Sequence, residues 1–478
     1  MRQIQCFCLV VCFLLSSAPL RADNVTDLMD LLQSDKSKVR YDAARSLKAL
    51  GPQARPAIKL LVAALSDTGA PIENPIQYLG PCVQDVASEA LVEIGRPAVP
   101  SLIEALRHRE KIIREYAAST LGEIGPPAKD SFAALTVLLN DNEDWVRYQA
   151  VVAIGKVGTD SSKVVPLLEG VFRRPNEDRF VRKAALAALH HADPQGKMAV
   201  PLLIEGLQSP DAEIVAGAAQ TLGKFHARAR SAVRVLNDQL HSKKRRGESY
   251  ADIVYTMPVR LDIIRALADI GPEAAAAVPT LKLFLAGEEL KDAEKDAPRI
   301  VLWEGKHEAE IIQVWAAAAL VRIVPNQPEA KAGFEFLVRK LHEVSEEPTR
   351  AQADAAEALG TIGTDAAIAV LIQALEAEDT SEYGSLRVSV ANALGDIGPP
   401  AKAAIPALRK ALQVKNPWHF GVPREAARAL GEMGTPARIA IPDLTRLRDS
   451  DGIWLRESVE DALQKLSADG KQVDVTKE

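Results

Sequence analysis

The chain has 478 residues, with 58 Lys and Arg against 64 Asp and Glu, a formal net charge of −6 at pH 7. Hydrophobic residues make up 47% and charged residues 26%, which excludes disorder for most of the chain. The acidic balance disfavours nucleic acid as a partner, because binding to phosphates relies on Lys and Arg. Aromatic residues make up only 5%, so the core must be built from Ala, Leu, Ile and Val, which suits close packing between helices.

Residues 1–22 have the layout of a secretory signal peptide. Arg2 precedes an apolar stretch, and small residues lead to Ala22, after which we place the cleavage. The apolar stretch is too short to span a bilayer. We therefore expect an exported protein, periplasmic or extracellular, with no stable transmembrane segment after cleavage; an uncleaved N-terminal membrane anchor is the alternative. Cleavage leaves Cys82 as the one cysteine, which we interpret as structural because it has no disulfide partner within the chain.

The pattern Ala-Ala-x-Ala-Leu-Gly-x-Ile-Gly recurs along the rest of the chain, for example as AASTLGEIG (117–125), AAEALGTIG (355–363) and AARALGEMG (426–434). About twelve copies follow one another at a typical spacing in the mid-thirties, which is the sequence signature of a solenoid. Each copy is predicted to be a pair of helices. The pattern ends the second helix of a pair, and its glycines are interpreted as helix terminators in the left-handed conformation, as is Gly158 after the helix predicted over 145–157.

The first helix of each pair carries an apolar-Pro-x-Leu string, as in VPSL (99–102) and IPAL (405–408). We expect this proline to lie inside the helix and to bend it, because it removes one backbone hydrogen bond. The string LGEIGPPA (121–128), which returns as LGDIGPPA (394–401), is then a helix end, a tight turn and the start of the next helix.

An arginine stands three positions before the Ala-Ala pair in seven copies. Acidic residues commonly precede it in the turn, such as Asp35, Asp144 and Asp178. We predict that such pairs form a structural ladder that ties neighbouring turns together, with a ligand-binding row of arginines as the alternative. The ladder arginines are Arg40, Arg114, Arg147, Arg182, Arg260, Arg387 and Arg456.

Long departures from the repeat all fall at the turn between the first and the second helix of a pair. They cover 66–83, 242–258, 287–310, 377–385 and 413–422. One edge of the solenoid is therefore expected to carry insertions, and most of the tryptophans lie in or beside these turns. Because Trp and Tyr are common anchors of interfaces, the candidate protein-binding residues are Trp303, Trp418, His419, Phe420 and Tyr255 at this edge, with Tyr41 and Tyr148 on the second helices.

Two alternatives remain at this edge. The aromatic side chains could instead only pack the insertions onto the solenoid. The basic run at 243–246 could meet an acidic partner or could simply be solvated.

The proline-bearing first helix, the turn Asp, the Arg of the second helix and the Leu-Gly-x-Ile-Gly ending resemble HEAT repeats, and most of all the bacterial HEAT-like repeats named after PBS (phycobilisome) lyases. The resemblance implies an all-α, right-handed solenoid, an armadillo-like superhelix of about twelve helix pairs over residues 23–466, followed by a polar tail at 467–478. It also implies a scaffold that binds another protein of unidentified nature through its concave face and its insertion-bearing edge, and that is otherwise monomeric. An adaptor or sensor subunit of an envelope assembly would differ only in its partner.

Some HEAT-like proteins are enzymes, and the resemblance allows this to be examined. HEAT-like hydroxylases hold two irons with His-Glu pairs placed directly before the Ala-rich core of the second helix. The His-Glu dipeptides here, His307-Glu308 and His342-Glu343, stand elsewhere. We therefore predict no catalytic, cofactor-binding or metal-binding residues and no cofactor. The alternative is a HEAT-like metal-dependent enzyme, hydroxylase-like or lyase-like, or a lyase-type chaperone subunit.

Overall fold

The computed structural model describes residues 23–70, 81–158, 160–241, 250–287, 299–343, 350–377, 385–414, 421–448, 450 and 452–468, with only the backbone described at 23–24, 250–258, 299–308, 385, 453 and 468. The predicted signal peptide, the basic run at 243–246 and the candidate residues Trp418, His419 and Phe420 lie outside these residues. The side chains of Tyr255 and Trp303 do so as well. All regular structure in the described ranges is helical, which confirms the all-α prediction.

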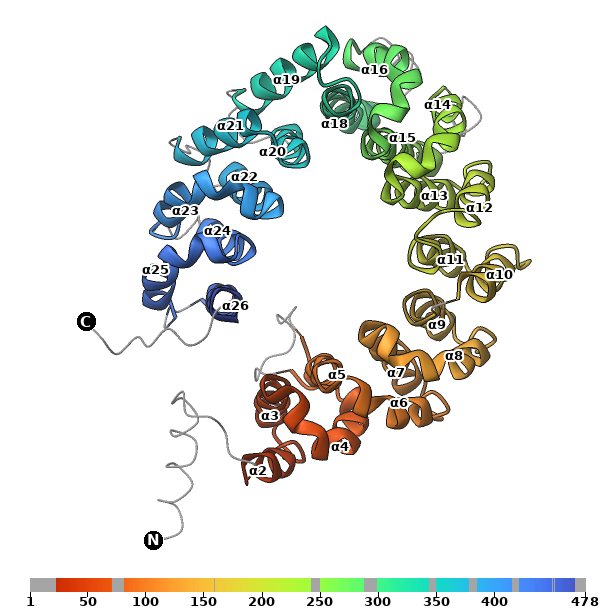
Figure 1. Cartoon of the computed structure of the whole chain (residues 1–478), viewed down its shortest axis with the longest axis vertical. Coiled ribbons are helices and arrows are strands. Elements are labelled where there is room, and N and C mark those ends of the chain that lie inside the picture. The colour runs from red at the N-terminus through yellow and green to blue at the C-terminus, as the bar shows by residue number, and fades with distance from the viewer. Residues whose placement is uncertain are drawn as a thin grey trace. The chain divides into compact units, whose positions relative to one another are not determined.

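The chain forms two compact units, with the boundary between Leu202 and Leu203. In unit 1, second helices lie side by side in one row and the shorter first helices in another (Figure 1). Its first helices are α2 (Asp23–Leu31), α4 (Ile58–Ala63), α6 (Val99–Ala105), α8 (Phe132–Leu138) and α10 (Ser161–Phe172), and its second helices are α3 (Ser37–Leu50), α5 (Val83–Ile94), α7 (Lys111–Ile124), α9 (Asp144–Val157) and α11 (Arg179–Ala192). The boundary itself lies in α12 (Ala199–Gly206).

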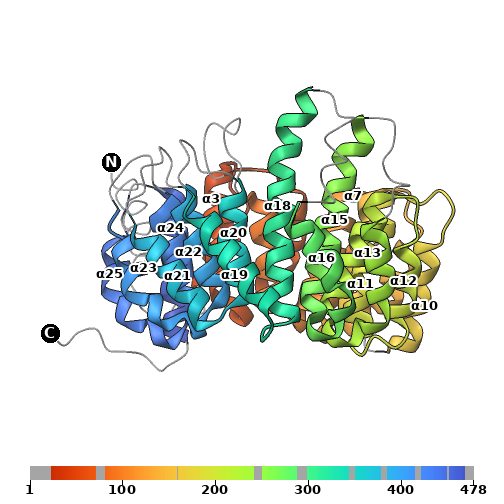
Figure 2. The ribbon, with the colours of Figure 1, turned by 90° about the horizontal axis from the view of Figure 1, so that it is seen from above.

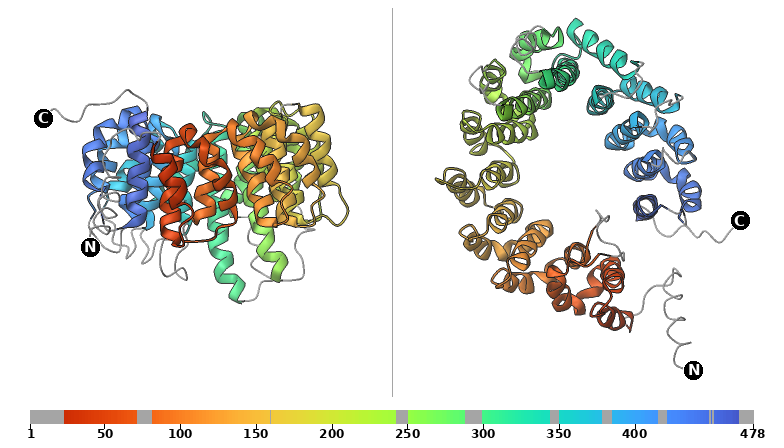
Figure 3. Two further views of the ribbon diagram at one scale, coloured as in Figure 1. Left: turned by 90° about the horizontal axis from the view of Figure 1, so that it is seen from below. Right: turned by 180° about the vertical axis from the view of Figure 1, so that it is seen from behind.

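Unit 2 has the same construction, and its second helices form the inner row of a curved stack (Figures 1 and 3). These second helices are α13 (Ala212–Lys224), α15 (Tyr250–Ile270), α18 (Arg299–Ile323), α20 (Arg350–Ile362), α22 (Ser385–Ile397), α24 (Gly421–Glu432) and α26 (Ile453–Ala468). The first helices are α14 (Val233–Leu240), α16 (Val278–Leu285), α19 (Pro328–Leu341), α21 (Asp365–Glu376), α23 (Ile405–Ala411) and α25 (Ile441–Arg446). The predicted solenoid of helix pairs is thus confirmed, and the number of pairs is close to the twelve expected.

Neighbouring second helices approach closely because small residues face each other. A Cβ on Gly155 of α9 would lie 2.8 Å from the Cβ of Ala188 in α11, and one on Gly431 of α24 would lie 2.9 Å from the Cα of Ala462 in α26. Both distances are too short for real side chains. The first glycine of the Leu-Gly-x-Ile-Gly pattern is therefore a packing position inside the helix, and its interpretation as a terminator was wrong.

The second glycine of the pattern does end the helix in the predicted way. Gly125 has φ of 69°, its N–H donates to the Leu121 carbonyl at 3.1 Å, and Pro126 starts a 3₁₀ helix, η5 (Pro126–Ser131). Gly158 behaves differently, because its φ is −72° and its ψ 127°, which is extended backbone. A Cβ there would lie 2.8 Å from the Ile154 carbonyl oxygen, so glycine is needed for space and the predicted left-handed conformation was wrong.

The prolines of the apolar-Pro-x-Leu strings mostly do not interrupt a helix. Pro100, Pro279 and Pro406 lie in the first turn of α6, α16 and α23, where the missing N–H would have no partner in the helix. Only the string around Pro166 places its proline inside a longer helix, α10. The first helix of a pair instead changes direction where a short 3₁₀ helix such as η4 (Arg96–Ala98) meets the α-helix.

Two of the predicted insertions are partly helical. Residues 250–258 and 299–310 extend α15 and α18 toward their N-termini, and these ends project beyond the other helices of unit 2 (Figure 2). Extension costs little once a helix has formed, because each added residue gains a backbone hydrogen bond. The remaining parts of these insertions lie outside the described residues, but the flanking helices place all five between a first and a second helix.

Candidate functional site

Three of the ladder arginines in unit 1 make the same set of contacts at the start of a second helix. The guanidinium of Arg114 donates to both carboxylate oxygens of Asp141 at 2.8 and 2.9 Å, and to the His108 carbonyl at 2.9 Å. Arg40 binds Asp67 in the same way at 2.5 and 2.9 Å. Each arginine therefore donates to a backbone carbonyl after the first helix of its own pair. It also forms an ion pair with an acid in the turn of the next pair.

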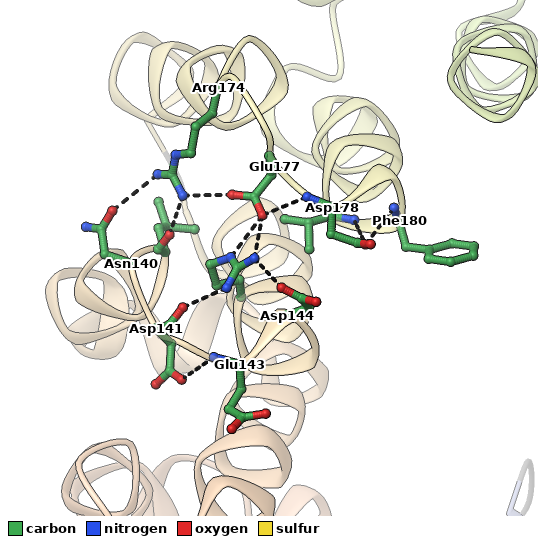
Figure 4. A network of polar contacts seen from close by, with 11 residues as sticks. Asn140, Asp141, Glu143, Asp144, Arg174, Glu177, Asp178 and Phe180 are labelled. Carbon is green, nitrogen blue, oxygen red and sulfur yellow. Dashed lines mark hydrogen bonds and ion pairs between the residues drawn. The ribbon is translucent and has the colours of Figure 1, made fainter.

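The third arginine of this set belongs to a larger network. Arg147 donates to Oε1 of Glu177 from Nε at 2.9 Å and from Nη2 at 2.7 Å, and Arg174 donates to Oε2 of Glu177 at 2.8 Å (Figure 4). Arg174 also reaches the Leu139 carbonyl at 2.7 Å, in the preceding turn. The Glu177 side chain is only 1% exposed, so this carboxylate depends on its two arginines for stability.

The turn that carries Glu177 has the residue types that its geometry requires. Asn176 has φ of 61°, a left-handed conformation that asparagine tolerates better than most residues. Asp178 then caps α11 by accepting the N–H groups of Phe180 and Val181 at 2.8 and 3.2 Å (Figure 4). The acid before the ladder arginine is thus a helix cap here, whereas Asp144 does contact Arg147.

These contacts shift the pKa values of the acids involved. Burial opposes the charged form of Asp141, but the hydrogen bonds from Arg114 and from the Glu143 backbone outweigh it and lower the pKa of Asp141. The pKa of Asp67 is lowered in the same way, with Arg40 and the Gly69 backbone as donors. Both carboxylates therefore contribute to the stability of the folded state.

The other ladder arginines make different contacts. Arg182 and Arg387 donate from Nε to carbonyls at the ends of first helices, Phe172 at 2.9 Å and Leu375 at 3.0 Å. Arg260 lies over the Phe284 ring at 5.8 Å from its centroid. For Arg456 the described contact is the backbone hydrogen bond of its N–H to Gly452 at 3.0 Å. The ion-paired ladder thus runs through Arg40, Arg114 and Arg147, and its acids mostly come from the following pair.

The two tyrosines predicted to contact a partner differ in accessibility. Tyr41 is only 7% exposed, so little of its ring is available. Tyr148 is half-buried, and its ring meets that of Trp145 edge-on with centroids 5.3 Å apart. Trp145 is 58% exposed and is therefore more accessible than Tyr148.

The second helices of unit 2 form a charged groove that the sequence analysis did not predict as a site. Its volume is about 620 Å³, and α15, α20, α22 and α24 line it. The small side chains Ser389, Asn392 and Ala393 of α22 lie between longer charged ones on α20 and α24. We name this feature the charged groove; its charged lining residues are Arg265, Arg350, Asp354, Glu357, Asp396, Glu425 and Arg428.

Trp315 of α18 anchors one side of the charged groove. Its ring is 3% exposed and carries the guanidinium of Arg265 at 3.8 Å from the centroid, a cation–π contact. Its indole N–H donates to Asp354 at 2.9 Å. Arg265 then reaches Glu357 at 3.1 Å, 92 positions away along the chain.

The opposite side of the groove has a second network around Arg428. Arg428 donates from Nε to Glu425 at 3.0 Å and from Nη2 to the side-chain oxygen of Asn392 at 2.9 Å. It also pairs with Asp396 at 3.2 Å. Glu425 itself is buried and receives Arg424 as well, so the two deep acids, Glu425 and Asp354, have cationic neighbours.

The carboxyl of Glu357 lies in an unfavourable electrostatic environment. Burial raises its pKa, and the neighbouring carboxylates Asp354 and Asp396 raise it further, against the lowering effect of Arg265. The Glu357 side chain is nonetheless 53% exposed. Glu357 is therefore a solvent-accessible carboxyl whose charged form is disfavoured first by burial and then by two neighbouring carboxylates.

A sequence signal for the charged groove existed in the repeat itself. The variable position of Ala-Ala-x-Ala-Leu is Arg265, Glu357, Asn392 and Arg428 in successive strong copies, and the structure places these side chains on one face. Polar and charged residues at that position could have been interpreted as a row on the surface of the second helices. The spacing alone could not show that Arg265 and Glu357 meet across the intervening α18.

In the described part of the chain, no group of three or more His, Cys, Asp and Glu side chains is placed to hold a metal ion. No helix among the described residues has the length and apolarity needed to cross a membrane.

Sequence comparison identifies the family. The model for HEAT repeats matches residues 99–190, 334–416 and 379–464, and that for PBS lyase HEAT-like repeats matches residues 39–67. Together these matches cover about half of the chain. The chain belongs to the HEAT-repeat proteins, as the repeat pattern predicted. No curated protein matches it.

Several solved structures match this chain at low sequence identity. The Kap95:Nup1 complex contains a chain with 13% identity and a TM-score of 0.52, and the match covers 92% of this chain and 68% of that one. Yeast importin-β (Kap95p) gives 12% identity, a TM-score of 0.46 and coverage of 92% and 68%. The CpcE–CpcF complex of phycocyanin lyase from Nostoc sp. gives 22% identity and a TM-score of 0.31, and the match covers 55% of this chain and 95% of that one. The HEAT solenoid is a fold typical of scaffolds for protein interaction.

Proposed function

We propose that this chain is an exported scaffold that binds another protein and performs no catalysis of its own. The observation that carries the proposal is the charged groove on the second helices of unit 2, where long charged side chains surround small residues of α22. Such a surface suits a protein segment better than an apolar small molecule, because ligand pockets for small molecules are mostly apolar. The signal-like residues 1–22 support export.

The experiment is affinity capture with the chain from Asp23 onward in a native cell-envelope extract, followed by cross-linking to locate the contacts. We expect a specific protein to be retained and cross-links to fall on α20, α22 and α24. If no protein is retained above the level of a bait-free control, the proposed scaffold function is refuted. Stoichiometric iron or zinc in the purified chain would instead favour the metal-dependent enzyme.

The insertion-bearing edge is the second surface of the proposal. The double variant Trp418→Ala/Phe420→Ala keeps every charged residue of the groove. If the edge contributes, this variant should retain less partner while its helical circular dichroism stays unchanged. Equal retention would restrict binding to the second helices.

A further inference from the structure

The charged groove presents opposite charges to solvent at two levels along its helices. Arg350, the first residue of α20, has a side chain that is 79% exposed. It pairs at 3.9 Å with Asp354, whose side chain is only 10% exposed. Two turns further along α20, Glu357 is 53% exposed and its partner Arg265 34%. At the first level the accessible group is therefore the cation, and at the second level it is the anion.

The adjacent helix strengthens the anionic level. Asp396 of α22 is 65% exposed, whereas Arg428, which pairs with it, is 32% exposed. Asp396 is close enough to Glu357 to raise the pKa of the Glu357 carboxyl. Arg265 and Arg428 are less exposed than these two carboxylates and are held by Trp315, Asn392 and Glu425. The solvent-facing groups at the second level are therefore mainly anionic.

The two levels have a defined separation. Arg350 and Glu357 are seven residues apart on one helix, which corresponds to a rise of about 10 Å at 1.5 Å per residue. An extended chain covers the same distance in about three residues. The small side chains of α22 beside this line leave space for a backbone.

We propose, resting on the scaffold function above, that the charged groove binds an extended segment of a partner protein in which a carboxylate and a Lys or Arg stand about three residues apart. The carboxylate of the segment pairs with Arg350, and its basic side chain lies between Glu357 and Asp396. Complementary charges of this kind set the direction of the segment as well as its register.

The test is to pan a displayed library of random twelve-residue peptides against the chain from Asp23 onward at low salt. We expect enrichment of peptides with an acid and a base about three positions apart, always in the same order. Enrichment without this spacing, or no enrichment, would overturn the inference. Capture of a partner protein with failed panning would leave the scaffold standing and remove only this inference.

Two variants separate the two levels. Glu357→Gln/Asp396→Asn should bind the selected peptides about threefold to fivefold more weakly and select peptides with no preference at the basic position. Arg350→Gln should instead lose the preference at the acidic position and keep the basic one. Each variant is expected to lose one preference and keep the other. Unfolding would abolish both preferences, so the two causes can be told apart.

The matched control neutralises an ion pair on the first helices of unit 2. Lys282 and Glu329 form an exposed pair at 3.0 Å between α16 and α19, and neither residue lines the charged groove. The variant Lys282→Gln/Glu329→Gln should select the same peptides as the unaltered chain. A changed selection there, or an unchanged selection by Glu357→Gln/Asp396→Asn, would contradict the assignment.

Discussion

The substitution Arg147→Ala tests the arginine ladder most directly. It removes the two hydrogen bonds to Glu177 at 2.9 and 2.7 Å and the one to the Asp141 carbonyl at 2.8 Å. Glu177 then keeps Arg174 and one backbone N–H, but its carboxylate remains 1% exposed with half of its cationic partners. We expect a loss of about 3 kcal/mol, the lower end of the range for breaking a buried ion pair.

Thermal unfolding followed by circular dichroism measures this loss. For a unit of nearly two hundred residues, about 3 kcal/mol corresponds to a decrease of roughly 6–12 °C in the melting temperature. Hydrogen exchange should also become faster in α9 and α11, because stability in a solenoid is set by contacts between neighbouring repeats. Binding of a partner to unit 2 should be unaffected.

The control is Arg173→Ala. Arg173, the residue that follows α10, is 52% exposed and pairs with Glu169 one turn before it, so removal of its side chain should cost at most about 0.5 kcal/mol. If Arg147→Ala and Arg173→Ala lowered the melting temperature equally, the ladder would not hold the turns together. Loss of partner binding without loss of stability in Arg147→Ala would instead make the arginine row a ligand surface.

Three other predictions concern packing, pH and the groove. Gly155→Ala should destabilise unit 1 by about 1–3 kcal/mol through overpacking, whereas Gly170→Ala in α10, where an added Cβ meets nothing within 4 Å, should stabilise it by about 0.5–1 kcal/mol; melting curves decide, and equal effects would contradict the close approach. Because the folded-state pKa of Asp141 is lowered, its contribution is complete above pH ~4 and is lost as the pH falls through the folded value; Asp141→Asn should flatten the melting temperature between pH 5 and 2, and an unchanged slope would refute this. Asp354→Ala should cost about 1–3 kcal/mol by leaving the Trp315 N–H unpaired and should change tryptophan fluorescence, while an unchanged spectrum would exclude that hydrogen bond.

The fold could be predicted because the same local pattern recurs in every copy of the repeat. Strong copies contain the residues of a helix end, a turn and a helix start, as in LGEIGPPA. In the structure Gly125 is left-handed and Pro126 begins a helix, as predicted. The errors concern residues whose role depends on a neighbouring repeat. Gly158 and Gly155 are glycines for reasons of space, which become visible only when Val164 of α10 and Ala188 of α11 are placed beside them.

The amino-acid sequence by itself determined the all-helical repeat, the turns that carry insertions and the arginines that begin the second helices, because these features are local and recur at a fixed period. Only the tertiary structure decided which acid each arginine meets, since Arg114 and Arg147 bind the following turn at 27 and 30 positions' distance. It also decided the charged groove, where Arg265 and Glu357 meet across an intervening pair of helices. Contacts of this length depend on how the pairs stack, and the stacking follows from the packing of small residues between helices.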